Sequence, residues 1–226
     1  MNLNEAFDFL NFWIGKERGA YYTIPELEAL ADAGQMAYYS DIKPKYATSN
    51  IIKEILSPFK KVYPFTPSNT ISGYIVVPSD VDYLDLLDLE IEVDISSRIL
   101  YKGVEMINED NRSDRLNSQV DPVTEADPVC EIMVPRYFKM YPVAGYKGRI
   151  TFLSRPIKPV FGYSVISGRV IVYNPATSTQ LQWRETEIIP VLLKALSSIG
   201  INLSSADVSN FAQLKTQSNY QNINRL

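Results

Sequence analysis

The chain begins with a segment in which apolar residues recur every three or four positions, the spacing of one helix face. Within residues 3–14 this stripe comprises Leu3, Ala6, Phe7, Leu10, Trp13 and Ile14. Phe9 and Phe12 lie off the stripe, so the helix is apolar on several sides. We expect it to pack against more than its own domain, with burial inside a bundle as the alternative. Gly15 and Gly19 are expected to break the pattern.

A second helix is predicted from Thr23 to about Asp41. Thr23 followed by Glu26 is a capping box, which satisfies free backbone donors at a helix start, and Pro25 is tolerated in the first turn. Its expected core stripe is Leu27, Leu30, Ala31, Gly34 and Tyr38. Pro44 ends this helix, and a third is predicted over residues 49–56 before Pro58.

Helical spacing returns near the end of the chain. Residues 185–198 form a predicted helix, with Pro190 close to its start and Gly200 just past its end. Its apolar stripe consists of Ile188, Ile189, Leu192, Leu193 and Leu196. A last helix is predicted from Ser204, with Val208, Phe211, Ala212 and Leu214 as its apolar residues. The polar tail 217–226 is not expected to fold by itself, because it cannot bury enough apolar surface.

The middle of the chain has strand-like patterns separated by Gly and Pro. The predicted strands are 74–77, 89–95, 131–134, 149–153, 160–165, 169–173 and 179–183. Residues 166–169 are a hairpin candidate with Gly168 in the turn, and 108–127 is expected to be a long exposed loop.

These patterns predict an α+β protein. The N- and C-terminal helices form one bundle, with Leu27, Leu30, Ile52, Leu192 and Leu196 in its core, around an inserted antiparallel β-sandwich or small barrel. The expected division is 1–60 with 185–226 as the helical domain and 61–184 as the β-domain.

Composition limits the possible chemistry. The 226 residues include no histidine, which excludes Ser-His-Asp and Cys-His nucleophiles, His-ligated zinc and histidine pH switches. Cys130 is the only cysteine, so no internal disulfide forms, and a buried, inert thiol is expected. A net charge of −4 argues against a surface that binds nucleic acid by neutralising phosphates. We see no secretory signal and no apolar run that would span a bilayer, so no membrane association is expected.

Three constellations could carry function. Asp80, Asp82, Asp85 and Asp88 precede the strand 89–95, but they lack the spacing of a calcium loop. Alternation instead puts Leu89, Ile91, Val93 and Ile95 inside and Glu90, Glu92 and Asp94 in water. A pair of acids could carry out hydrolysis if they were held a fixed distance apart, but the sequence does not give their separation. The 15 tyrosines suit protein interfaces, sugar-binding platforms or the core. We therefore expect no enzyme, with no catalytic, cofactor-binding or metal-ligating residue.

Two regions resemble a known family. In the first region the matching segments are Phe12–Lys16, Thr23–Leu27, Gly34–Tyr39 and Leu56–Lys60, and in the second they are Leu153–Val160 and Ser178–Trp183. They look like virion proteins of Bacteroidetes-infecting, crAss-like tailed phages. The layout is also similar to the tail adaptor or tubular protein of short-tailed phages, in which terminal helices dock under the portal.

The resemblance implies a head-to-tail connector or ring protein. Such a protein would form a homo-oligomeric ring, in twelve copies if it follows the portal, and would contact the portal and neighbouring tail proteins. DNA would pass through it without sequence-specific binding, and Glu90, Glu92 and Asp94 would form an acidic band if they faced the lumen. The protein would assemble in the bacterial host cytoplasm and reside in the virion. A carbohydrate- or receptor-binding β-module is the alternative, and a carboxylate hydrolase a third class.

Overall fold

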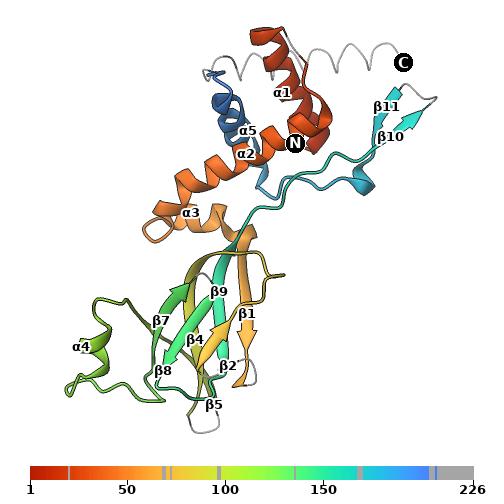
Figure 1. The fold of residues 1–226 in the computed structure, drawn as a ribbon. Helices are drawn as coiled ribbons and strands as arrows, with labels where there is room; N and C mark the ends of the chain where they lie inside the picture. Colours follow the sequence, from red (N-terminus) through yellow and green to blue (C-terminus); the bar gives the residue numbers. More distant parts are fainter. Residues whose placement is uncertain are drawn as a thin grey trace. The chain divides into compact units, whose positions relative to one another are not determined.

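The computed structural model describes residues 1–19, 21–67, 70–71, 73–95, 98–134, 136–166, 170–203 and 207. The expected α+β class is confirmed. The chain divides into two compact units, a helical unit of Met1–Ile55 with Pro156–Leu226 and a β unit of Leu56–Arg155 (Figure 1). The borders differ from the expected ones, because residues 156–184 group with the helices rather than with the strands.

Helix α1 spans Leu3–Arg18, longer than predicted. Asn2 and Glu5 form a capping box at its start, and Gly19, with φ 63°, ends it in the left-handed conformation. Gly15 therefore does not break the helix. Phe9 is fully buried within the chain, and Phe12 is only 39% exposed. The apolar character of several sides of α1 is thus satisfied largely by burial within its own chain, so it does not by itself require an external partner.

Helix α2 spans Ile24–Ile42 and α5 spans Glu185–Ser198, as the sequence predicted to within a residue or two. The short α3 covers Asn50–Ile55, and the 3-10 turn η1 covers Lys43–Lys45. Four of the five expected core residues are buried, namely Leu27, Leu30, Leu192 and Leu196. Ile52 is only half-buried, and on α2 Tyr39 is buried where Tyr38 was expected.

The helices α2 and α5 come very close together at Gly34. A Cβ atom there would lie 2.6 Å from the Ala195 Cβ and 2.8 Å from the Val191 carbonyl oxygen. Since real Cβ atoms do not come this close to backbone, the missing side chain of Gly34 is what lets the two helices touch.

Residues 156–184 form an irregular extension of the helical unit. It contains the two strands β10 (Tyr163–Ile166) and β11 (Val170–Tyr173), followed by the 3-10 turn η4 (Pro175–Thr177). β10 and β11 pair antiparallel, as the hairpin prediction required, while the turn residues 167–169, Gly168 among them, lie outside the described residues. The strand predicted at 179–183 is wrong, since only an isolated bridge between Val160 and Thr179 forms there.

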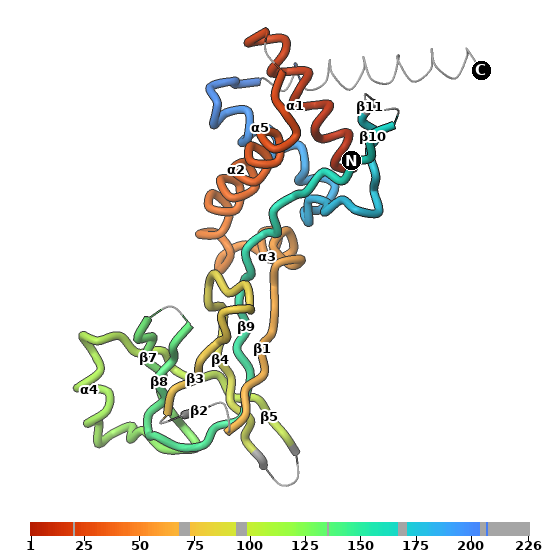
Figure 2. Tube along the Cα trace, turned by 45° about the vertical axis from the view of Figure 1, so that its right-hand side comes forward, coloured from red at the N-terminus to blue at the C-terminus, as the bar shows by residue number. Residues whose placement is uncertain are grey.

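The β unit consists of two sheets. A four-stranded sheet has the order β1-β9-β4-β5, and a five-stranded sheet has the order β2-β3-β8-β7-β6. Their bounds are β1 Lys60–Phe65, β2 Thr70–Ile71, β3 Tyr74–Val76, β4 Tyr83–Ile95, β5 Arg98–Gly103, β6 Glu105–Ile107, β7 Val129–Val134, β8 Tyr137–Tyr141 and β9 Gly148–Ser154. The sheet was expected to be antiparallel throughout, but β6 and β7 run parallel. Figure 2 shows β1, β9 and β4 side by side.

One apolar core joins the two sheets. The four-stranded sheet contributes Phe65, Leu89, Ile91, Ile150 and Phe152, and the five-stranded sheet contributes Ile75, Cys130, Phe138 and Met140. Alternation along β4 is as predicted for Leu89 and Ile91, which face this core. Among the helices that the structure describes, none has the length and apolar character needed to cross a membrane.

The expected loop 108–127 is exposed over most of its length but not structureless. It contains the short helix α4 (Arg112–Leu116) and is fastened by ion pairs. Arg115 reaches both Glu105 (2.7 Å) and Asp121 (3.0 Å), and Lys102 reaches Asp127 (2.8 Å). These contacts fix the segment against its own sheet.

We expect Gly34→Ala to lower the free energy of unfolding of the helical unit by about 1–3 kcal/mol, because overpacking against Ala195 outweighs the better helix propensity of alanine. Trp13 and Trp183 are the only two tryptophans and both belong to this unit, so denaturant titration followed by tryptophan fluorescence measures it. Gly103→Ala, on β5 of the other unit with nothing within 4 Å of its Cβ position, is a control that should leave the tryptophan transition unchanged. Equal stability of Gly34→Ala and wild type would show that α2 and α5 do not pack this closely.

Candidate functional site

Two acids of the strand β4, Glu90 and Glu92, are paired with cations. Glu90 lies opposite Arg149 in the β4–β9 ladder, with 2.5 Å between Arg149 Nε and Glu90 Oε2. Glu92 Oε2 lies 2.7 Å from Lys147 Nζ, and the Tyr101 hydroxyl donates to Glu92 Oε1 at 3.1 Å. The hydrogen bond from Lys147 lowers the pKa of Glu92 below its usual value, so the carboxylate stays ionised.

This pairing changes the interpretation of the acidic band. The Glu90 and Glu92 side chains are only 19% and 17% exposed, so they are covered rather than fully in water. The Arg149 guanidinium also lies 4.0 Å from the centre of the Tyr101 ring. The Asp94 side chain lies outside the described residues. Because each of the two described acids has its own cation, this face is not an uncompensated negative surface.

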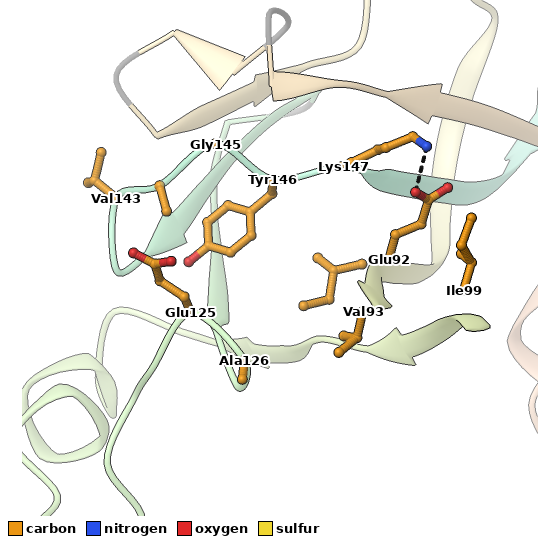
Figure 3. A pocket seen from close by; sticks show the side chains of 11 residues that line it. Glu92, Val93, Ile99, Glu125, Ala126, Val143, Gly145, Tyr146 and Lys147 are labelled. Carbon is orange, nitrogen blue, oxygen red and sulfur yellow. Dashed lines mark ion pairs between the residues drawn. The ribbon is translucent and has the colours of Figure 1, made fainter. Parts of the chain in front are cut away.

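A groove of about 770 Å³ lies beside this strand (Figure 3). Its walls include Val93, Ile99 and Val143, and Lys147 lies at one end, paired with Glu92. Figure 3 shows the hydroxyl end of Tyr146 directed toward the side of the groove where Glu125 lies.

Tyr146 is only 6% exposed, and its hydroxyl donates to the Pro142 carbonyl at 2.8 Å. Burial and the nearby Glu125 carboxylate raise the pKa of Tyr146 to about 12. Within the described part of the chain, the Glu125 carboxylate has no ion-pair or hydrogen-bond partner. The groove thus combines apolar side chains with the ion pair of Lys147 and Glu92 and with one carboxylate, Glu125, that has no partner among the described residues.

A tyrosine platform for sugars finds little support in this geometry. Stacking on a sugar needs an exposed ring face. Tyr146 is buried, and Arg149 occupies one face of the Tyr101 ring, which is 44% exposed. Tyr137 and Tyr163 are about half exposed, but they belong to different units.

The described residues contain no group of three or more His, Cys, Asp or Glu side chains that could hold a metal ion. Asp80, Asp82, Asp85 and Asp88 are therefore not gathered into such a group. Cys130 is fully buried in the core, as expected, and burial raises the pKa of its thiol to about 12. At neutral pH this thiol is protonated and unreactive.

Sequence reasoning missed a buried acid on the other sheet. The Glu131 side chain is 6% exposed, and the Arg112 guanidinium on α4 donates to it at 3.2 Å and 3.4 Å. The Tyr141 hydroxyl donates to the same carboxylate at 3.1 Å. The only available signal was an acid inside the apolar run Val129–Val134, which a strand tolerates when a partner covers it.

The β10–β11 hairpin is apolar and exposed on both faces. Tyr163, Val165 and Ile171 share one face with exposed fractions of 50%, 54% and 56%, while Ile166 (53%) and Val172 (39%) lie on the other. The sequence predicted the hairpin but gave no sign that neither face would be covered.

Compared with models of known protein families and with curated proteins, the chain gives no match.

We expect Cys130 to resist a thiol reagent such as DTNB in the native protein at pH 8 and to react fully after denaturation. Burial keeps the thiol neutral well above its unfolded pKa of about 8.5. Met133→Cys, at a position 44% exposed on the same strand, is the control and should react at once. Rapid labelling of native wild type would contradict the burial of Cys130.

Arg112→Ala should destabilise the β unit more than Lys102→Ala does. Removing Arg112 leaves a nearly buried carboxylate with one partner fewer, which costs about 1–3 kcal/mol. Lys102 and Asp127 are both about half exposed, so the loss of their ion pair should cost less than about 1 kcal/mol. Urea unfolding followed by far-UV circular dichroism measures both variants. Adding Glu131→Gln to Arg112→Ala should recover part of the loss, and no recovery would exclude a charge effect.

Proposed function

We propose that this chain is a structural subunit of the head-to-tail connector or tail ring of a tailed phage and forms part of its DNA-conducting channel. The observation that carries the proposal is the nested architecture. Helices from both ends of the chain pack into one unit, while the middle of the chain forms a separate β unit. This layout is what the resemblance to tail adaptor proteins led us to expect.

The surface chemistry supports an assembly role. Glu90 and Glu92 of β4 are neutralised within the chain, whereas large apolar side chains are exposed on the β10–β11 hairpin. Exposed apolar area of this kind typically marks a protein interface. The proposed partners are further copies of the chain, the portal and neighbouring tail proteins, with the virion as the site of action.

A carbohydrate- or receptor-binding β-module is the second candidate, and the groove beside β4 is the observation that favours it. Binding of a sugar there would rely on Glu125 and the apolar walls rather than on a stacked tyrosine. Glycan-array binding that disappears with Glu125→Ala would favour this candidate over the connector.

The direct test of the connector is electron microscopy of the purified protein, alone and mixed with the portal of the same phage. We expect a ring of uniform copy number that binds coaxially to one end of the portal. A portal from an unrelated phage is the control and should not be decorated. A protein that leaves the portal bare and is absent from purified virions by mass spectrometry would exclude the proposal.

A further inference from the structure

A second groove, here called the α2–α5 groove, lies in the helical unit along these two helices, which run side by side (Figures 1 and 2). Its volume is about 360 Å³, and Pro190 and Leu193 of α5 line it. Both are only partly buried, whereas Leu192 and Leu196 of the same helix are fully buried. Helix α5 therefore carries more apolar surface than the described residues cover.

The polar side chains along the α2–α5 groove already have partners. Lys194 forms an ion pair with Asp41, and the Tyr38 hydroxyl donates a hydrogen bond to the Glu187 carboxylate. The Ser197 hydroxyl donates a hydrogen bond to Asn202 Oδ1 at 3.2 Å. Burying a charged group against these side chains would cost desolvation without a new ion pair in return. The groove thus favours an uncharged, apolar occupant.

The chain itself turns back toward this groove where α5 ends. Gly200, with φ 80°, ends the helix in the left-handed conformation, and the Ile201 N–H donates to the Leu196 carbonyl at 2.9 Å. This pattern is a common helix stop and redirects the chain. Leu203 then lies in the wall of the groove together with Ser197, so the chain has returned to the side of the helix that it has just left.

The segment beyond Leu203 starts at the same end of α5. The helix predicted from Ser204 lies outside the described residues except at Asp207. Asp207 borders a small cleft together with Gly200 and Arg18, so at this position the chain has not left the end of α5. Residues 208–214 therefore begin close to one end of the α2–α5 groove.

The sequence of residues 208–214 matches this groove in character and length. Val208, Phe211 and Ala212 have the spacing of one helix face, and the seven residues include no charge. At 1.5 Å per residue, a helix over them would be about 10 Å long, which is also the length of α5 from Pro190 to Ser197. Helices joined by a short connection commonly pack antiparallel.

We propose that residues 208–214 dock as a short helix on the α2–α5 groove of the same chain, antiparallel to α5, with Phe211 against Leu193. Only four residues separate Leu203 from Val208, so the local concentration of the segment at the groove is on the order of 1 mM. A free partner would have to compete with this tethered segment. The docking concerns one chain by itself and does not rest on the proposed connector function.

The reactivity of a thiol in the groove tests the docking. Ser197 is exposed among the described residues, so the thiol of a Ser197→Cys protein reacts slowly only if a further segment covers it. Labelling by DTNB should become at least about tenfold faster when Phe211→Asp or Val208→Asp is added, because a charge on the apolar face opposes docking. The buried thiol of Cys130 does not compete.

Two controls separate undocking from general loosening of the fold. Tyr220→Asp adds the same charge beyond residues 208–214 and should leave the labelling rate of Ser197→Cys unchanged. Met133→Cys, on the β unit, should react at one rate with and without Phe211→Asp. Circular dichroism and tryptophan fluorescence confirm that each variant is folded.

Dilution distinguishes the chain's own segment from that of a second copy. Slow labelling of Ser197→Cys should persist over a roughly hundredfold dilution, because an intramolecular contact does not depend on protein concentration. Protection that disappears on dilution would assign the segment to a second copy and overturn the proposal. Equal rates with and without Phe211→Asp would overturn it as well, since residues 208–214 would then not cover the groove. Neither result changes the outcome of the portal experiment.

Discussion

The antiparallel pairing of β1 with β9 is the constraint on which the nested architecture depends. These are the first and last strands of the β unit, and Lys60 lies opposite Leu153. At the end of this strand pair, the Ser154 hydroxyl donates a hydrogen bond to the Phe59 carbonyl oxygen at 3.1 Å. Because the two strands are neighbours, the chain leaves the helical unit and returns to it at adjacent points of the β unit. Helix α5 can therefore pack on α2 although the whole β unit lies between them in the sequence.

Charge and apolar area are distributed differently over the molecule. Ion pairs within the chain neutralise three glutamates, namely Glu90, Glu92 and Glu131. Further ion pairs hold the segment that carries α4. Such pairs contribute modestly to stability, but they leave little net charge on the sheet faces. Large apolar side chains are exposed on the hairpin, and Ile99 and Val143 are exposed beside the groove. Association is thus expected to depend on shape and apolar burial.

The sequence predicted those features that short-range patterns determine. The helix from Glu185 to Ser198 was predicted to the residue because its apolar spacing and Gly200 are local signals. The segment 179–183 has the alternation of a strand, yet Leu181 and Trp183 are buried without a neighbouring strand to pair with, so alternation alone misled. Strand β1 was missed because lysines and a proline give an edge strand little apolar pattern.

The site was less accessible to sequence reasoning than the fold. Alternation placed Glu90 and Glu92 outside, but their partners come from β9, and cross-strand register is a property of distant segments. Likewise the partner of Glu131, Arg112, lies 19 residues away in a segment whose sequence predicts a loop, so the sequence did not indicate this pair.

The split helical unit imposes an order on synthesis. When α1 and α2 leave the ribosome, their apolar faces lack α5, which is made only after all of Leu56–Arg155. The β unit is contiguous and can fold as soon as it emerges. By bringing its own ends together, it shortens the effective loop between α2 and α5 and so reduces the entropy lost when they meet. A nascent chain stalled before Glu185 would therefore present a finished β unit beside helices that still expose their core residues, a state in which chaperones would have most to protect.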